Sequence, residues 1–588
     1  MNFWKQALLN LRLIKVRRFL GSFFYSLQRD TLERHFQSSS IEVFAEIGNI
    51  LSAEPTARGG KFYFQNVELE ICFLADDLIR IDWQPGVLPI LYTITRKDWP
   101  EIEVKFQELG DRWLISSAAL KVIISLNGSV ELQNAHGQTI REELPPQQKT
   151  SGWLHQAKLR SLEYIYGLGE RAAPLNLRTT PATSSYQMWN YDAGGRYGPG
   201  TDPLYLCIPA YREDASLPQH STQHSLEGRG GDHREAHNVY GLLQAEAAYE
   251  ALSEYKPELR PFIVSRAGWV GLQRYAWTWT GDIETSWSGL RQTIPTILNL
   301  GLSGIPYSGA DIGGFKGNPS AELYLLWFQM STFLPFFRTH SANNVKPRTP
   351  WGFGEPTLSI VREFLQLRYK LMPYLYTLAW EANQRGYPLM RPLFWADSAD
   401  KRLWDVEDTF LLGDVLLVAA IVESGATSRS ITLPKGYWYN FWDDTLLEGA
   451  NTVNITAPIE QIPILVKAGS ILPMSVGEQL ILHIYTHITL TSEGQVYSDA
   501  GDGYGEWRLD KFYLKHDACK EGGDRNILEI TWQQQGDYAF PYTTVKLHFH
   551  GVEVEQAWID NRKVNCQNNC LEVEQFQRVR LNFNSIKV

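Results

Sequence analysis

The sequence predicts a multidomain protein of mixed α/β and all-β class. A partial (β/α)8 barrel of the TIM type is expected between an amino-terminal β-sandwich and two carboxy-terminal β-sandwich domains. Period-two alternation of apolar and polar residues dominates before about residue 211 and is typical of antiparallel sheets. Between residues 260 and 340, short apolar runs alternate with helical patterns, which indicates βα units of a parallel sheet. After residue 395, short alternating strands separated by Gly and Pro turns return.

These patterns divide the chain into five regions. They are an amphipathic helical segment over 1–40, a β-sandwich over 41–211, a truncated (β/α) barrel over 212–395, a proximal β-domain over 396–475 and a distal β-domain over 476–588. The barrel region is shorter than a complete (β/α)8 barrel usually is.

Composition narrows the function classes. The chain has 588 residues and a net charge of -10, which argues against nucleic acid as a partner and suits an enzyme that handles neutral substrates. Its five cysteines are few and scattered, which fits a reducing compartment better than a disulfide framework. They are Cys72, Cys207, Cys519, Cys566 and Cys570. No metal-ligand motif is apparent, so we expect neither a metal nor another cofactor.

The first 40 residues mix basic and apolar side chains. Lys and Arg interrupt the apolar positions repeatedly, so the pattern is not that of a secretory signal but of an amphipathic helix. Such a helix either packs on the protein, which we favour, or lies on a membrane surface. Because no stretch reaches the roughly 18 apolar residues of a transmembrane helix, we expect a cytoplasmic protein.

The region 41–211 contains several runs in which apolar and polar residues alternate. Gly, Asn, Asp and Pro separate these runs, as in an antiparallel β-sandwich. The expected strands are Lys61–Val67, Leu69–Leu74, Leu78–Trp83, Trp113–Ser117 and Leu120–Ser125.

Charged residues stand where four successive apolar runs end, between residues 260 and 340. A single aspartate after a strand often serves as a turn former or helix cap. Functional groups also lie just beyond the carboxyl ends of parallel strands, and a set at successive strand ends favours a site. The residues in these positions are Arg266, Asp282, Asp311, Arg338 and His340.

The same stretch carries a family resemblance. The segments RPFIVSRAG (260–268), WTWTGD (277–282), GIPYSGADIGGF (304–315) and LPFFRTH (334–340) resemble the second half of the catalytic barrel of the α-glucosidases of glycoside hydrolase family 31. The family usually has Asn after the aspartate of the second segment, whereas Ile283 stands here. The β-domain at 41–211 and the two carboxy-terminal domains also resemble those of the family.

The resemblance implies a role for each residue of the set. Asp282 would be the general acid/base, which protonates the glycosidic oxygen and later activates water. The other residues would contact the sugar: Arg266 and His340 in the first subsite, Asp311 at a hydroxyl, Trp279 as an aromatic wall, and Arg338 beside them. The run MWNYD (188–192) resembles a loop that reaches over the family's active site, so Asp192 would also touch substrate; a plain turn aspartate is the alternative.

One part of the family pattern is missing. The segment from Glu227 to Gly241 resembles the part that follows the nucleophile, yet only a few residues after Tyr211 separate it from the amino-terminal domain. The first four barrel strands and the WxDMNE-type motif that carries the nucleophile are expected in that interval. No such motif occurs elsewhere in the chain. We therefore identify no nucleophile.

Length supports a partial barrel independently, because a closed (β/α)8 barrel usually needs ~250 residues. The βα-like region from about 217 to 395 is shorter and includes one long helix expected around Leu358–Gln384. A half barrel would expose the inward faces and two edges of its strands unless another chain closed it. A retaining glycosidase also needs two carboxyl groups ~5 to 5.5 Å apart, and only one is present.

Three interpretations follow. The first is a family 31-type retaining α-glucosidase that hydrolyses α-glucosides, impaired or inactive because the nucleophile segment is absent. The second is a non-catalytic carbohydrate-binding or regulatory relative, and the third is a half-barrel subunit that a partner chain or self-association completes. Replacement of the nucleophile by Asp311 in an inverting arrangement is disfavoured.

Overall fold

The computed structural model describes residues 16–35, 43–86, 96, 98–149, 152–161, 163–178, 186–190, 198–201, 217–487, 492–518 and 526–583. The chain forms two compact units. The first contains Met1–Glu163 and Leu217–Glu235, and the second contains Tyr164–Ser216 and Ala236–Val588. Each is described by itself. Within the described residues, no helix combines the length and the apolar character that crossing a membrane requires.

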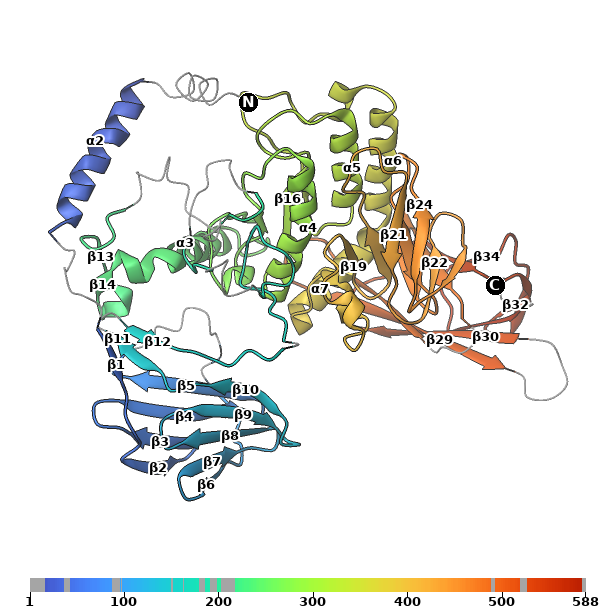
Figure 1. Cartoon of the computed structure of the whole chain (residues 1–588). Helices are drawn as coiled ribbons and strands as arrows, with labels where there is room; N and C mark the ends of the chain where they lie inside the picture. Colours follow the sequence, from blue (N-terminus) through green and yellow to red (C-terminus); the bar gives the residue numbers. More distant parts are fainter. Residues whose placement is uncertain are drawn as a thin grey trace. The chain divides into compact units, whose positions relative to one another are not determined.

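The first unit is a β-sandwich preceded by a helix (Figure 1). One layer is a four-stranded sheet in the order β2-β3-β4-β5, and the other is a five-stranded sheet in the order β10-β9-β8-β7-β6. Both are antiparallel, as the alternation predicts. The strands are β2 (Ser52–Thr56), β3 (Gly59–Tyr63), β4 (Glu68–Ala75), β5 (Leu78–Gln84), β6 (Lys105–Glu108), β7 (Arg112–Ser116), β8 (Leu120–Ser125), β9 (Val130–Asn134) and β10 (Thr139–Glu143).

Alternate residues of these strands form one core. Phe62, Leu69, Ile71, Ile115 and Val122 are fully buried and pack together between the layers.

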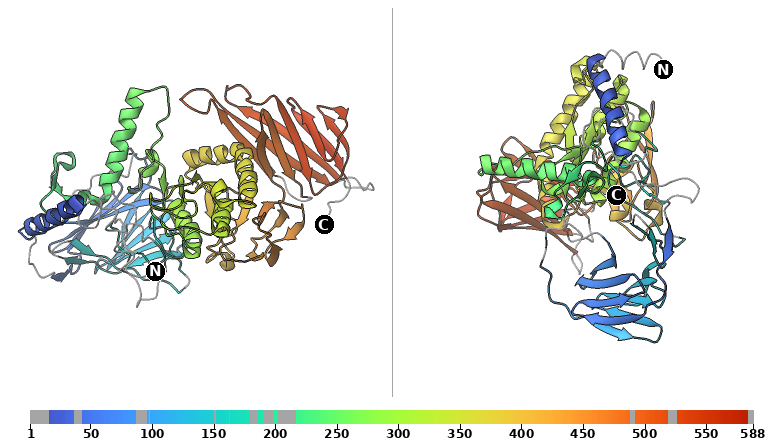
Figure 2. Two further views of the ribbon diagram at one scale, coloured as in Figure 1. Left: turned by 90° about the horizontal axis from the view of Figure 1, so that it is seen from above. Right: turned by 90° about the vertical axis from the view of Figure 1, so that its left-hand side faces the viewer.

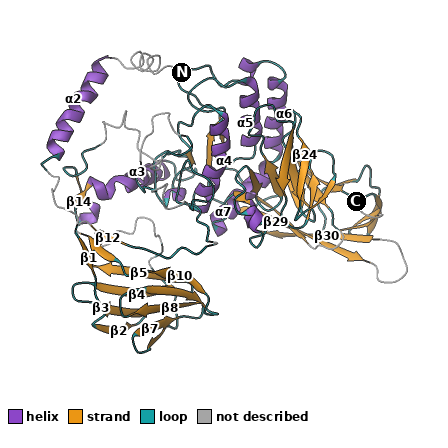
Figure 3. Ribbon diagram, viewed as in Figure 1, coloured by secondary structure: helices purple, strands orange, loops and turns teal. Residues whose placement is uncertain are grey.

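Two smaller sheets also belong to the first unit. One consists of β1 (Phe44–Glu46), β11 (Gln147–Lys149) and β12 (Gly152–Leu154), and the other consists of β13 (Gln223–His224) and β14 (Gly231–Asp232). Figure 3 shows the strand content of this region.

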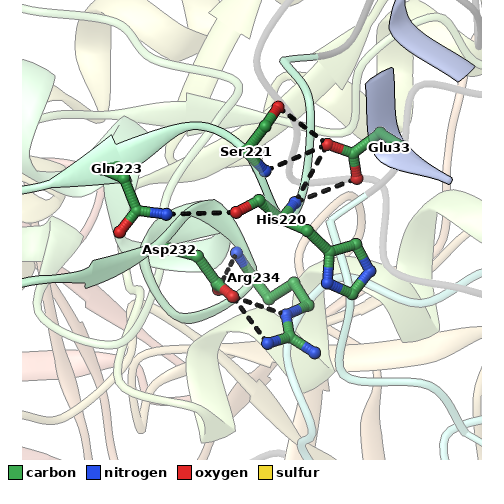
Figure 4. A network of polar contacts seen from close by, with 6 residues as sticks. All are labelled: Glu33, His220, Ser221, Gln223, Asp232 and Arg234. Carbon is green, nitrogen blue, oxygen red and sulfur yellow. Dashed lines mark hydrogen bonds and ion pairs between the residues drawn. The ribbon is translucent and has the colours of Figure 1, made fainter. Parts of the chain in front are cut away.

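The amino-terminal helix α2 (Val16–Glu33) is joined to the later segment of the same unit through its last residue (Figure 4). The carboxylate of Glu33 accepts hydrogen bonds from the backbone N–H groups of His220 and Ser221 and from the Ser221 hydroxyl. Burial opposes ionisation of Glu33, but these hydrogen bonds outweigh it and lower its pKa. The expected packing of this helix on the protein itself is therefore seen at its carboxyl end. Residues 1–15 and 36–42 lie outside the described part.

The second unit contains the predicted parallel strands. β15 (Thr278–Trp279), β16 (Ser308–Asp311) and β17 (Phe336–Arg338) form a parallel sheet in that order, and Val264 adds a parallel bridge to Trp277. Three of the four expected apolar runs thus become strands, and the run before Arg266 becomes a bridge. β16 is buried along its whole length, so the expected exposure of inward strand faces is wrong for this strand. Its neighbours on both edges cover its backbone.

Helices connect and cover these strands. They are α3 (His233–Tyr255), which begins in the first unit, and α4 (Trp287–Leu302), α5 (Ala321–Ser331), α6 (Thr357–Lys370) and α7 (Met372–Arg385). Ser286 and Ser320 cap α4 and α5, because each side chain accepts a hydrogen bond from a backbone N–H in the first turn.

The long helix expected around Leu358–Gln384 is two helices. α6 ends at Lys370, and α7 begins at Met372 with Pro373 in its first turn. Proline lacks the N–H that a continuous helix would use and its ring clashes with the preceding turn, so the helix restarts here.

The remaining strands of the second unit form two carboxy-terminal β regions, orange to red in Figure 2. The proximal sheet has the order β18-β19-β20-β25-β22-β23, with β21 and β24 paired separately. Its strands are β18 (Met390–Pro392), β19 (Thr409–Leu412), β20 (Leu416–Ala419), β21 (Ser428–Thr432), β22 (Tyr437–Asn440), β23 (Leu446–Glu448), β24 (Thr452–Thr456) and β25 (Ile464–Lys467).

The distal region packs one sheet of order β26-β27-β31-β34 on another of order β28-β29-β30-β35-β32-β33 around a common apolar core. Its strands are β26 (Ile471–Val476), β27 (Gln479–Tyr485), β28 (Ser492–Asp499), β29 (Trp507–Ala518), β30 (Asn526–Gln535), β31 (Thr544–His550), β32 (Val554–Ile559), β33 (Arg562–Val564), β34 (Cys570–Val573) and β35 (Arg578–Phe583). The predicted fold class, with β-sandwiches on both sides of a TIM-type region, is confirmed. The exact domain boundaries stay a prediction.

Candidate active site

The parallel sheet brings its charged residues to one edge. Asp311 is the last residue of β16 and pairs in register with Arg338 at the end of β17. Asp282 follows β15, and Arg266 follows the bridge at Val264. Since the strands are parallel, their carboxyl ends face the same way, and the predicted residues gather there.

Arg266 and Asp282 form an ion pair. The distance from Arg266 Nη1 to Asp282 Oδ1 is 3.6 Å. The Arg266 side chain is almost buried, at 9% exposure, whereas Asp282 is 21% exposed. A buried guanidinium cannot lose its proton, so it supplies a fixed positive charge next to a carboxylate that remains open to a ligand. Ile283, which follows Asp282, is fully buried and so anchors the turn that presents the carboxylate.

Asp311 is the most buried of the predicted residues. Its side chain has no exposed surface, and Arg338 Nε lies 2.9 Å from its Oδ1. Burial raises the pKa of Asp311 to about 7, and the negative charge of Asp282 adds to this rise, while Arg338 and Arg348 oppose it. The group therefore titrates near neutral pH and can either donate or accept a hydrogen bond there.

Aromatic rings border this pair. The Arg338 guanidinium lies over the Trp279 ring, with 4.7 Å between its Cζ and the ring centroid. His340 stacks on Phe315 with a centroid distance of 5.5 Å, and burial together with Arg338 lowers its pKa, so its imidazole is mostly neutral. Flat apolar faces beside hydrogen-bonding groups are suited to a pyranose ring.

Glu170, the last residue of the segment GLGE (167–170), is a buried acid that is not among the predicted site residues. Its carboxyl is fully buried, and neither of its oxygens has a hydrogen-bond partner among the described residues. Burial raises its pKa well above the ordinary value, and the charge of Arg266 opposes that rise. The electrostatic effect of Arg266 links Glu170 to the predicted site. The only available signal was a glutamate in an otherwise apolar, Gly-rich turn.

Asp192 lies outside the described residues, so its predicted contact with substrate stays a prediction. The residues just before it are described. Trp189 stacks on His237 with a centroid distance of 3.8 Å, and the Asn190 carbonyl lies 2.8 Å from His237 Nε2. The start of the loop is thus attached to α3 within the second unit.

Buried polar atoms without hydrogen-bond partners cluster around the sheet. Within the described part of the chain they include the hydroxyls of Thr278, Thr280 and Ser308 and the indole Nε1 of Trp279. Such groups cost free energy unless a ligand, water or another polypeptide pairs with them. A polar group that paired with them would therefore stabilise this part of the sheet.

Comparison with known families agrees with this arrangement. The glycosyl hydrolase 31 N-terminal galactose mutarotase-like domain matches residues 68–215, and the glycosyl hydrolases family 31 TIM-barrel domain matches residues 180–378. The glycosyl hydrolase family 31 C-terminal domain matches residues 386–472. The matches follow the order of domains that the fold shows.

Individual relatives are similar over part of their length. An α-glucosidase 2 of Bacillus thermoamyloliquefaciens is 35% identical over 358 residues, which cover 58% of this chain and 44% of the relative. A probable glucan 1,3-α-glucosidase of Arabidopsis thaliana is 40% identical over 310 residues, which cover 51% of this chain and 34% of the relative. The chain thus spans less than half the length of these two proteins.

A solved structure has the same fold. The family 31 dextranase of Flavobacterium johnsoniae in complex with glucose superposes with a TM-score of 0.79 over 92% of this chain and 100% of the dextranase chain, at 18% identity. Together, the domain matches, the relatives and the fold lead to one conclusion: this chain belongs to glycoside hydrolase family 31.

Proposed function

We propose that this chain carries the acid/base half of a retaining α-glucosidase site and that it binds the terminal glucose of an α-glucoside. The observation that carries the proposal is the ion pair between Arg266 and Asp282 at the carboxyl ends of parallel strands. Similarity to the α-glucosidases supports the glucoside as substrate, and dextranase structures solved with glucose or isomaltotriose support a carbohydrate ligand.

Each side chain has a defined part in this proposal. Asp282 protonates the glycosidic oxygen as the bond breaks and later takes a proton from the attacking water. Arg266 and His340 hold the sugar in the first subsite, and Asp311 binds a hydroxyl while Arg338 keeps it in place. The face of Trp279 forms the wall against which the ring packs.

The sequence lacks the motif that would carry the second carboxylate of the proposed site, the nucleophile. A retaining mechanism forms a glycosyl ester on a nucleophile ~5 to 5.5 Å from the acid/base. Asp311 is an unsuitable substitute, because it is fully buried, pairs with Arg338 and has a pKa raised to about 7. Loss of a covalent nucleophile removes many powers of ten in rate. We therefore expect the chain by itself to bind α-glucosides but to hydrolyse them very slowly.

The test is an assay of p-nitrophenyl α-glucoside and maltose hydrolysis with purified protein, with Asp282→Asn as the matched variant. We expect no measurable turnover from either protein, while both bind maltose in calorimetry. Turnover at an ordinary enzymatic rate of ~1 to 1000 per second that Asp282→Asn abolishes would contradict the claim that the catalytic pair is incomplete. Absence of maltose binding would contradict the proposed sugar site.

A carbohydrate-binding or regulatory role is the second candidate, and the missing nucleophile motif favours it. It would use the same sugar contacts at Arg266, Trp279, Asp311 and His340 without the chemistry of Asp282. An experiment that adds the missing barrel half as a second polypeptide separates the two candidates. An enzyme half would then hydrolyse the substrate in a way that depends on Asp282, whereas a binding protein would not.

We propose the cytoplasm as the compartment, because the few scattered cysteines suit reducing conditions. Closure of the half barrel by a partner chain is likewise a proposal.

A further inference from the structure

Three histidines meet on one face of the distal β region, far along the chain from the sugar site. β27 and β31 are parallel neighbours, with His483 opposite His548 and Tyr485 opposite His550. Side chains alternate across a strand, so Leu482 and Leu547 enter the apolar core while the histidines lie on the opposite face. The pairing thus brings together residues 65 positions apart in the sequence.

We propose that His483, His548 and His550 bind a divalent transition-metal ion, with Zn²⁺ the best fit. One ring nitrogen of each residue lies within 4.8 Å of those of the other two. His483 Nδ1 and His550 Nε2 are 2.9 Å apart. Two nitrogens bound tetrahedrally to zinc at ~2.0 to 2.1 Å are ~3.3 Å apart, so small side-chain rotations convert this arrangement into a three-histidine site.

Asp444 orients the central ligand. Its carboxylate oxygens lie 2.8 and 3.0 Å from His550 Nδ1, which must therefore carry the proton and donate. This leaves the lone pair on Nε2, the nitrogen that faces His483. A carboxylate behind a metal-binding histidine is the usual arrangement in zinc sites, where it fixes the tautomer and raises the basicity of the ligand. Tyr485 stacks on the His550 ring at 4.2 Å and restricts its rotation.

The charged groups around the cluster act in opposite directions. The charges of Lys370 and Lys546 act on His483 and disfavour a cation, whereas the carboxylate of Asp444, which bonds to His550, favours one.

A purely structural role accounts for only part of the cluster. A hydrogen-bond chain runs from His483 through His550 to Asp444 and satisfies those three groups. Among the described residues, His548 contacts the other two rings without joining that chain. Coordination of a metal ion would account for the position of the His548 imidazole beside the other two rings.

One member of the cluster borders a cavity. His483 lines a cavity of about 410 Å³ together with Glu363, Lys370, Trp442 and Ile481, whereas His548 and His550 do not line it. In our proposal an ion would approach the cluster from the side of His483. The inference is independent of the proposed glucoside site, because none of these residues takes part in it.

The test measures zinc binding to the full chain prepared without a histidine tag and freed of metal by a chelator. Competition with a chromophoric chelator gives stoichiometry and affinity. We expect one Zn²⁺ per chain, an affinity loss of at least ~10-fold in His548→Ala, and a ~10 to 100-fold loss in Asp444→Asn. Asn tolerates the left-handed backbone of Asp444, whose φ is 59°, so this variant keeps its fold.

His136→Ala is the matched control, because His136 is exposed on the first unit and should leave zinc binding unchanged. Visible absorption of the Co²⁺-loaded protein gives a second measurement, since tetrahedral nitrogen ligation produces intense bands that His548→Ala should lose. Circular dichroism shows whether each variant is folded. No stoichiometric binding by the folded parent, or equal affinity in folded His548→Ala, would overturn the proposal and leave the cluster as a hydrogen-bonded structural element.

Discussion

At the residue scale, the burial of the Asp311 carboxyl lowers the stability of the folded chain at neutral pH. Its ordinary pKa is 3.8, and burial raises it to about 7 in the folded chain. Between these values the unfolded chain has lost the proton that the folded chain still holds, so stability falls as pH rises and stays low above the folded pKa. At 1.36 kcal/mol per pKa unit, the penalty at neutral pH and above is up to about 4 kcal/mol.

Asp311→Asn should therefore stabilise the protein. Asparagine has nearly the same shape and cannot ionise, so the penalty disappears. We expect a gain of up to about 4 kcal/mol above pH about 7 that fades toward pH about 4, where both folded and unfolded chains hold the proton. Thermal unfolding measured across this pH range checks the trend, and calorimetry with maltose should show weaker binding at the same time. A variant that loses stability at neutral pH would show that the ion pair with Arg338 outweighs the cost of burial.

At the scale of single elements, β16 depends on the absence of a side chain at Gly309. A Cβ placed there would lie 1.9 Å from the carbonyl oxygen of Phe336 on the neighbouring strand β17. A backbone atom that already belongs to the sheet cannot move aside without breaking the parallel pairing. Gly309 therefore allows the pairing that keeps Asp311 and Arg338 in register. A substitution that disrupts this pairing should both destabilise the sheet and displace these two site residues.

Gly309→Ala should destabilise the second unit by about 1 to 3 kcal/mol or more, because it overpacks a fully buried strand. Gly505→Ala is the matched control, since a Cβ at that position meets nothing within 4 Å. Chemical denaturation of both variants gives the comparison. Equal midpoints for the two proteins would show that the sheet is held by other contacts, and retained maltose binding in Gly309→Ala would show that the strand register does not set the site.

The sequence predicted the elements whose signal is local. The apolar runs before Asp282, Asp311 and Arg338 each stop abruptly next to a charged residue, so the strand ends and their charged residues could be placed from the pattern. Pro373 was also visible in the sequence, but the helical pattern on both sides of it led to the prediction of one continuous helix. The missing N–H of Pro373 interrupts the helix even though the apolar pattern continues past it.

Features created by long-range pairing were not predictable. The three-histidine cluster depends on the parallel register of β27 and β31, which no spacing in the sequence specifies, and the sequence reading expected no metal. Glu170 gave no sign of complete burial, because burial depends on what packs over a turn. The charged residues at the strand ends could be grouped from the sequence because the (β/α) architecture gathers strand ends at one edge, whereas a sandwich face has no such rule; their role in sugar binding stays a prediction.

At the scale of the whole molecule, our proposal gives the chain one half of a two-part chemistry. In that proposal Asp282 acts as the acid/base beside the buried guanidinium of Arg266, and the motif that the sequence lacks would supply the nucleophile. Within them, the parallel sheet consists of β15, β16 and β17 with the bridge at Val264, far fewer strands than a closed barrel contains. Buried hydroxyls without partners beside this sheet favour a polar partner surface there.

Complementation should restore activity. We expect hydrolysis of p-nitrophenyl α-glucoside when this chain is co-expressed with the part of the Bacillus thermoamyloliquefaciens α-glucosidase 2 that corresponds to the missing barrel half. The family resemblance places the nucleophile motif in that half, and its addition would bring a nucleophile to the edge of the sheet that carries Asp282. Asp282→Asn in this chain is the matched control and should abolish the restored rate, and the added half by itself should be inactive. A stable complex of the two halves without turnover would mean that Asp282 is not placed for catalysis. The non-catalytic sugar-binding role would then be the better account of why Arg266, Asp311 and Trp279 are held together.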